Sequence, residues 1–190
     1  RLMSNHKFNE KKNVENILNL LKEKKIVSLV SDAGTPTVSD PGTILINECI
    51  KNKIEIFPVP GSTAVSAAIS VSGFSQNYIF FGFLPERKKD QDQLFQKISS
   101  LNYSLVFFIS PKKIKKTIHQ IQRYFNDREI LIAREMTKLH EEYIRCNVEN
   151  LNNVNISHKG EMTVVISENK NIQKRLQVIE ESVRKKIIKL

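Results

Sequence analysis

Two loops rich in glycine, proline and short hydroxyl side chains are the parts of this sequence best suited to bind a ligand. The first, SDAGTPTVSDPG at residues 31–42, follows the apolar run IVSLV, and the second, PGSTA at residues 60–64, ends the run IEIFPV. Glycine lets a backbone approach a ligand closely, and proline fixes the shape of a loop before binding. Each loop alone could simply end a strand and begin a helix. As a pair, they predict a small-molecule site.

The residue types in these loops narrow the class of ligand. The chain contains neither a GxxxxGK[ST] phosphate loop nor a GxGxxG fingerprint, which excludes the common nucleotide-binding motifs. Backbone amides and short hydroxyls, which suit a neutral or zwitterionic ligand containing adenosine, dominate instead. The hydroxyls belong to Ser31, Thr35, Thr37, Ser39, Ser62 and Thr63.

Alternating strands and helices are expected to position these loops. The apolar runs at residues 26–30 and 54–59 predict buried strands, and helical spacing predicts helices at about 10–24 and 43–52. Each loop would then leave the carboxyl end of a strand in a parallel sheet, where ligands bind in open α/β folds. The chain opens on Arg1 and a helix, so we expect the first domain to be incomplete.

A second group of elements follows a polar joint near residue 75. Strands are predicted at residues 78–83, 104–109, 129–133 and 162–167, with helices before the second and third of them. The predicted organisation is an amino-terminal α/β domain at 1–75, a carboxy-terminal α/β domain at 76–168 and a basic amphipathic helical tail at 169–190.

Composition limits the partners of the chain. A formal charge of +10, from 30 Lys plus Arg against 20 Asp plus Glu, attracts polyanions such as nucleic acid. No apolar run approaches the ~18 residues of a membrane span, so we expect a cytoplasmic protein with no membrane partner. Cys49 and Cys146 lie far apart without metal-ligand spacing, so we expect no metal.

Four motifs, in this order, resemble the ribosomal small-subunit 2′-O-methyltransferase I family of the tetrapyrrole methylase-like (class III) methyltransferases. They are SLVSDAGTPTVSDPG, PVPGSTAVSAAISVSGF, FFGFLP and AREMTKLHEEYIR. The resemblance implies two α/β domains of the tetrapyrrole methylase type, usually as a homodimer, with S-adenosyl-L-methionine in the cleft between them. The implied substrate is a cytidine ribose 2′-hydroxyl in the decoding centre of 16S rRNA, within the small ribosomal subunit.

The resemblance also implies which residues bind the cofactor. These are Asp32, Ala33, Gly34, Thr35, Pro36, Gly61, Ser62, Thr63, Ala64, Ser110, Thr137 and Met162. The chain departs from the family where Ile109 replaces an acid and where Lys112 and Lys113 replace His-Arg. The amino-terminal strand of the family, with its TPIGNL-like loop, is not found in this sequence.

Methyl transfer to a ribose hydroxyl benefits from a group that accepts its proton. The catalytic candidates within the motifs are Asp32, Glu135 and Lys138, although TKLHEE on a helix would equally form salt bridges. The RNA-binding candidates, chosen because phosphate contacts need cations, are Arg87, Lys88, Lys89, Lys112 and Lys113.

Two alternatives stay open. In the first, the chain is a truncated, non-catalytic remnant of this fold that binds RNA or forms a dimer. In the second, it is a methyltransferase of the same superfamily that acts on a small tetrapyrrole-like substrate.

Overall fold

The computed structural model describes residues 2–169. The chain divides into two compact units, Arg1–Thr63 (unit 1) and Ala64–Leu190 (unit 2). This division comes before the boundary predicted near residue 75, because helix α3 (Ala64–Ser72) packs through Val65 and Ala68 against the strands of unit 2. The predicted helical tail lies outside the described residues from residue 170 onward.

Unit 2 is built on one five-stranded mixed sheet with the order β1-β2-β5-β3-β4. Its strands are β1 (Tyr78–Phe83), β2 (Ser104–Ile109), β3 (Glu129–Arg134), β4 (Glu142–Asn147) and β5 (Met162–Ile166). Only β1 and β2 pair in parallel, and the other three pairings are antiparallel. A helix connects β1 to β2, which is the long crossover that a parallel pair requires, whereas a short turn joins β3 to β4.

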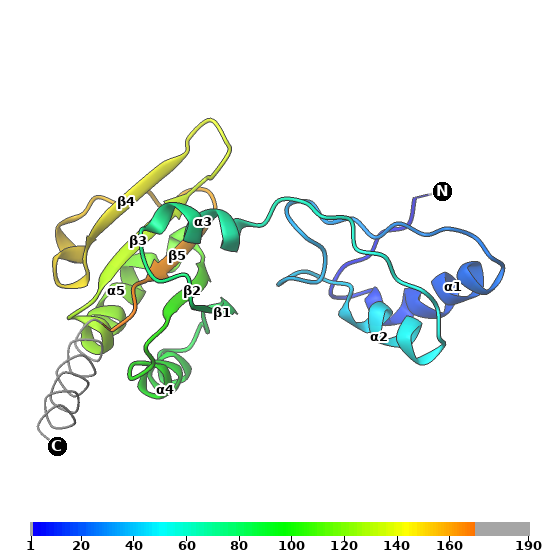
Figure 1. Ribbon diagram of the computed structural model, residues 1–190, viewed down its shortest axis with the longest axis horizontal. Coiled ribbons are helices and arrows are strands. Elements are labelled where there is room, and N and C mark those ends of the chain that lie inside the picture. Colours follow the sequence, from blue (N-terminus) through cyan, green and yellow to red (C-terminus); the bar gives the residue numbers. More distant parts are fainter. Residues whose placement is uncertain (1, 170–190) are drawn as a thin grey trace, which may run out of the picture. The chain divides into compact units, whose positions relative to one another are not determined.

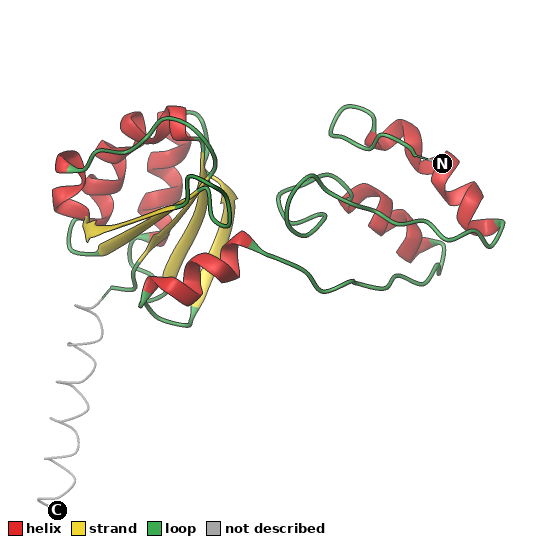
Figure 2. Ribbon diagram, turned by 90° about the horizontal axis from the view of Figure 1, so that it is seen from above, coloured by secondary structure: helices red, strands yellow, loops and turns green. Residues whose placement is uncertain are grey.

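Helices cover both faces of this sheet (Figures 1 and 2). Helices α4 (Lys88–Ile98) and α5 (Pro111–Phe125) and the 3₁₀ helix η1 (Val148–Asn153) pack on one face, and α3 packs on the other. Strand β2 serves both layers because its side chains alternate: Leu105 and Phe107 belong to the first core, and Val106 belongs to the second.

Unit 1 contains helices α1 (Glu10–Lys22) and α2 (Thr43–Lys51), which pack through an apolar seam that includes Val14, Leu18 and Leu45. The strands predicted at 26–30 and 54–59 are a wrong prediction, since the described part of unit 1 contains no strand. Both segments are extended but pair with no neighbour there, and a strand is stable only when its backbone groups are paired. Most of their apolar side chains are exposed, namely those of Ile26, Val27, Val30, Ile56, Phe57 and Val59, whereas Leu29 and Ile54 are half-buried.

Two further predictions were wrong in unit 2. The sequence predicts no strand between residues 133 and 162, but residues 142–147 form β4, which pairs with β3 along its whole length. The stretch TKLHEE is predicted to lie on a helix, but residues 135–141 form turns between these two strands. An exposed edge strand with alternating polar residues carries too weak an apolar signal to be recognised.

None of the helices within residues 2–169 is both long and apolar enough to span a membrane.

Candidate active site

In unit 1 the two predicted loops lie against each other. The Thr35 hydroxyl donates a hydrogen bond of 3.2 Å to the carbonyl oxygen of Ser62. Gly34 lies beside the same carbonyl, since a methyl group added to its α carbon would stand 3.8 Å from that oxygen. The structure therefore brings together the two segments of unit 1 that were predicted to bind the cofactor, residues 32–36 and 61–63.

The first loop has a strained backbone. Thr37 and Ser39 have φ angles of 70° and 65°, in a region that residues with side chains rarely occupy. Gly42 has a φ of 134°, and a methyl group there would come within 2.9 Å of Thr37 and 2.7 Å of Leu29. Strained backbone persists only where surrounding contacts determine it, and it gathers at ligand-binding sites. The loop thus has one imposed shape, and its residues 32–34 are exposed.

A buried carboxylate fixes the end of this loop. Glu10, the first residue of α1, is 7% exposed. Its Oε1 accepts hydrogen bonds from the backbone N–H groups of Gly42 (2.8 Å) and Ile44 (2.9 Å) at the start of α2. These N–H groups have no partner within a helix, and the positive end of the helix dipole attracts a carboxylate. Glu10 therefore sets the point at which the loop joins α2.

Replacing Glu10 with alanine is expected to lower the free energy of unfolding of unit 1 by about 2 kcal/mol, because both N–H groups lose their acceptor. Urea denaturation followed by circular dichroism measures the change. Glu10→Gln keeps an oxygen acceptor and should lose less, and Glu15→Ala, on an exposed position of the same helix, serves as the control. Equal midpoints for Glu10→Ala and Glu15→Ala would contradict the role assigned to Glu10.

In unit 2 the predicted cofactor residues lie together at one end of the central strands β2, β5 and β3. Met162, at the start of β5, pairs with Ile109 at the end of β2 and with Arg134 at the end of β3. Ser110 and the turn that carries Thr137 follow directly from these two strand ends. The side chains of Met162 and Ile109 are 3% and 4% exposed and belong to the core. Their side chains therefore serve packing, and Ile109 offers no polar group at this position.

Glu135 joins the turn after β3 to the segment before β5. Its Oε1 accepts hydrogen bonds from Lys138 Nζ (3.1 Å) and from the backbone N–H of Glu161 (2.8 Å). Lys138 Nζ also donates to Glu161 Oε2 at 2.8 Å. Gly160, with a φ of 91°, lies next to the Glu135 side chain, and a methyl group on it would stand 2.5–2.6 Å from three of its atoms. We call these four residues the Glu135 network.

The same contacts set the protonation of the network. The Glu161 N–H and, after it, Lys138 hold the pKa of Glu135 below its ordinary value. Hydrogen bonds to Glu161 and then to Glu135 raise the pKa of Lys138. Glu135 thus stays ionised down to acid pH, and Lys138 stays protonated into alkaline pH. Near neutral pH this ion pair is therefore better suited to hold the turn after β3 against the segment before β5 than to accept a proton.

The residues predicted to contact RNA follow the carboxyl ends of strands β1 and β2. Because these strands are parallel neighbours, the helices that follow them, α4 and α5, begin at the same end of the sheet. Lys113, in the first turn of α5, forms an ion pair with Glu86, which precedes α4. All five predicted RNA contacts are exposed there: Arg87, Lys88, Lys89, Lys112 and Lys113.

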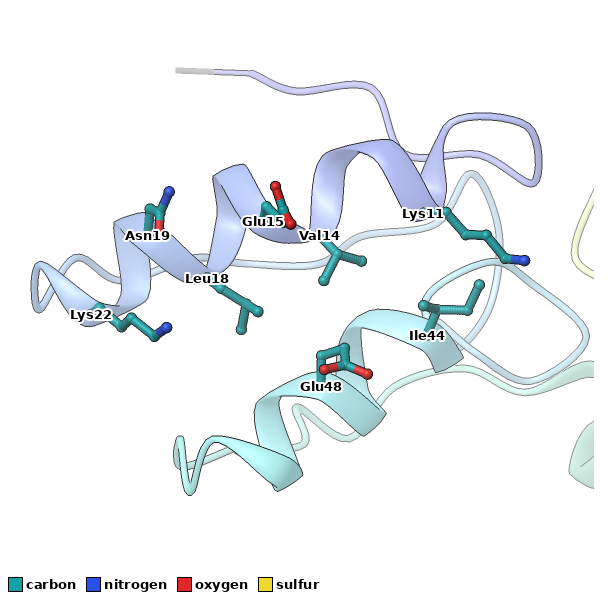
Figure 3. A pocket seen from close by; sticks show the side chains of 8 residues that line it. All are labelled: Lys11, Val14, Glu15, Leu18, Asn19, Lys22, Ile44 and Glu48. Carbon is teal, nitrogen blue, oxygen red and sulfur yellow. The ribbon is translucent and has the colours of Figure 1, made fainter.

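An open groove of about 610 Å³ lies between α1 and α2 of unit 1 (Figure 3). Val14, Leu18 and Ile44 point into it, and charged side chains of both signs, Lys11 and Glu48 among them, surround these apolar groups. None of the predicted site residues lines it. Among residues 2–169, no group of His, Cys, Asp or Glu side chains is arranged to hold a metal ion.

Sequence reasoning missed Glu10 and Gly160. Glu10 carried only the weak signal of an acid in the first turn of a helix, and its partners lie more than thirty residues away. Gly160 precedes a strand, where a turn glycine is ordinary. The requirement for glycine arises from its contact with Glu135, which only the folded chain reveals.

Comparison with known sequences identifies the family of the chain. Residues 2–152 match the family model described as Tetrapyrrole (Corrin/Porphyrin) Methylases. The chain is 45% identical over 173 residues to the Ribosomal RNA small subunit methyltransferase I of Thermotoga maritima, covering 87% of this chain and 76% of that protein. It is 37% identical over 179 residues to the protein of the same name from Mesomycoplasma conjunctivae, covering 92% and 74%.

Solved structures show the same fold at low sequence identity. The methyltransferase CobJ aligns with a TM-score of 0.62 at 16% identity, covering 84% of this chain and 71% of CobJ. Diphthine synthase aligns with a TM-score of 0.60 at 15% identity, covering 83% and 67%. A uroporphyrin-III C-methyltransferase from Thermus thermophilus, complexed with S-adenosyl homocysteine, aligns with a TM-score of 0.54 at 12% identity, covering 83% and 73%.

Proposed function

Because the chain belongs to the ribosomal RNA small subunit methyltransferase I family, within the tetrapyrrole methylases, we propose that it methylates the ribose 2′-hydroxyl of a decoding-centre cytidine in 16S rRNA with S-adenosylmethionine. The observation that carries the proposal is the 45% identity over 173 residues to a Ribosomal RNA small subunit methyltransferase I. The family model matches residues 2–152, which include both loops of unit 1 and the whole turn at 135–141. An enzyme with this substrate would work in the cytoplasm, and a homodimer stays a prediction.

The loops of unit 1 have the chemistry that this cofactor requires. S-adenosylmethionine carries an adenosine with hydroxyl groups and a zwitterionic amino-acid end, and it has no phosphate. The exposed backbone of Ala33, Gly34 and Gly61 can approach such a ligand closely. The bond from Thr35 to Ser62 holds the loops together before binding, which lowers the entropy lost on binding. We propose that residues 32–36 and 61–64 contact the cofactor, with Ser110, Thr137 and the backbone of Met162 as its contacts in unit 2.

When bound, the cofactor supplies a methyl group on a positively charged sulfur, which an oxygen nucleophile can attack. The chain must orient the ribose oxygen toward that methyl group and accept the hydroxyl proton. Asp32 is our first candidate for the acceptor, since it is exposed and forms no ion pair in the described part of the chain. Glu135 and Lys138 are proposed to act in the same reaction as an ionised pair that holds the turn after β3.

The test is incubation of the purified chain with 30S subunits that lack the methyl group and with methyl-labelled S-adenosylmethionine, followed by digestion to nucleosides. We expect the label in 2′-O-methylcytidine. Label on a base would overturn the ribose chemistry. Transfer to a small tetrapyrrole but not to RNA, or cofactor binding without any transfer, would instead support one of the two alternatives, a tetrapyrrole enzyme or a non-catalytic remnant.

A further inference from the structure

The outward face of α5 carries only basic side chains. The helix contains no Asp or Glu, and its buried positions are filled mainly by apolar residues that face the sheet, such as Ile114, Ile118 and Ile121. The exposed positions are Lys112, Lys113, Lys115, Lys116, His119 and Arg123.

Four of these residues form a straight row. Lys112, Lys116, His119 and Arg123 are separated by steps of four, three and four residues, which places them on one side of a helix with 3.6 residues per turn. The row is about 16 Å long, from the helical rise of about 1.5 Å per residue. At its end the Arg123 guanidinium lies 5.4 Å from the ring centre of Tyr124, a contact that orients it. We call this row, with the adjacent Lys115, the α5 stripe.

General enrichment in lysine does not account for the α5 stripe. The other long helices of the described chain mix both signs of charge: α1 carries Glu15 among its lysines, and α4 carries Asp90 and Asp92. One residue of α5 does form an ion pair: Lys113, which lies beside the row and not in it, pairs with Glu86. The cations of the stripe form none of the ion pairs found among residues 2–169.

We propose that the α5 stripe binds the phosphate backbone of the small-subunit ribosomal RNA. This extends the RNA contact along α5, beyond the five predicted residues that follow strands β1 and β2. The choice of RNA as partner rests on the proposed function. Each strand of duplex DNA carries one phosphate per about 3.4 Å of helix axis, and an RNA strand likewise carries one phosphate per nucleotide, so a row about 16 Å long can face more than one phosphate. Such contacts anchor and orient the RNA without reading its bases.

The experiment compares two triple variants with the same change of charge. The first is Lys115→Gln with Lys116→Gln and Arg123→Gln, and the matched control is Lys11→Gln with Lys12→Gln and Lys22→Gln on α1. Filter binding to a 16S rRNA fragment over a series of salt concentrations should show about tenfold weaker binding for the α5 variant, with a salt slope lower by about 2. The control should bind like the unchanged protein. In the methylation assay the α5 variant should raise KM for 30S subunits and leave kcat unchanged.

Other results would overturn the inference. Equal loss in both variants would mean that net charge alone attracts RNA. Normal binding of the α5 variant to free RNA together with weaker binding to 30S subunits would assign the stripe to an acidic ribosomal protein. If the unchanged protein methylates no RNA, the proposed function fails, and the comparison of binding still decides whether the stripe contacts RNA.

Discussion

Replacing Arg128 with methionine is expected to lower the free energy of unfolding of unit 2 by on the order of 3 kcal/mol, because one buried and two partly buried carbonyl groups would lose their donor. The Arg128 side chain is almost fully buried, with 2% of the residue exposed. Its guanidinium donates to the carbonyl oxygens of Ser99, Leu101 (2.9 Å) and Ser167 (3.0 Å). These carbonyls lie after α4, before β2 and after β5.

Arg128, in the turn between α5 and β3, thus holds two other segments at one end of the sheet, the α4–β2 connection and the residue that follows β5. Its guanidinium also lies 5.2 Å from the centre of the Phe125 ring, which adds a cation–π contact. Burial lowers the pKa of Arg128, with Asp127 and Glu168 opposing the shift, but a guanidinium stays charged throughout the physiological range. A methionine fills the space and can donate to none of the three oxygens.

Thermal or urea unfolding of the full chain measures this loss. Arg145→Met is the matched control, since Arg145 is exposed and donates to a single carbonyl, that of Val71. We expect the control to change stability by less than about 1 kcal/mol. A loss of stability for Arg128→Met no larger than that of the control would show that the three contacts contribute little.

Replacing Gly160 with alanine is the second change with a large expected effect. Its φ of 91° alone costs a residue with a side chain roughly 1–3 kcal/mol, and the new methyl group would displace the Glu135 side chain. Glu135 would then lose its bonds to Lys138 and to the Glu161 N–H, which hold the turn after β3. We expect methyl transfer to fall at least tenfold, measured as kcat/KM in the assay with 30S subunits.

Gly73→Ala separates the two causes. Gly73 has a φ of 72°, but nothing lies within 4 Å of the position of the added methyl group, so this variant carries the backbone strain without the displacement. It should lose stability and keep methyl transfer. Adding Glu135→Ala to Gly160→Ala should recover part of the lost stability, because the displaced side chain is gone. Equal activity of Gly73→Ala and Gly160→Ala would show that the Glu135 network does not support methyl transfer.

The sequence predicted the elements of unit 2 better than those of unit 1. The strands β1 and β2 have the predicted bounds, because each is an apolar run between polar turns. The runs at 26–30 and 54–59 look the same in sequence, yet they are not strands, since strand formation depends on a neighbour that local composition does not reveal. Strand β4 was missed because half of it faces solvent at the edge of the sheet.

For the candidate site, which stays a prediction, the sequence indicated the loops but not the contacts that hold them. Glycine and proline located both loops of unit 1, since these residues impose shape locally. The bond from Thr35 to Ser62 crosses 27 residues of sequence, and the approach of Gly160 to Glu135 crosses a whole strand and a 3₁₀ helix. Such contacts depend on tertiary packing, so the sequence named Thr35, Ser62 and Glu135 without their partners and did not single out Gly160.

The central claim is that the paired loops of unit 1 bind the methyl donor, and a titration of the ¹⁵N-labelled chain with S-adenosylhomocysteine, followed by amide chemical shifts, tests it most directly. We predict saturable shifts at the amides of Gly34, Thr35 and Gly61, with little change at Val14 and Leu18 in the groove between α1 and α2. Saturable shifts confined to that groove, with the two loops unchanged, would contradict the account.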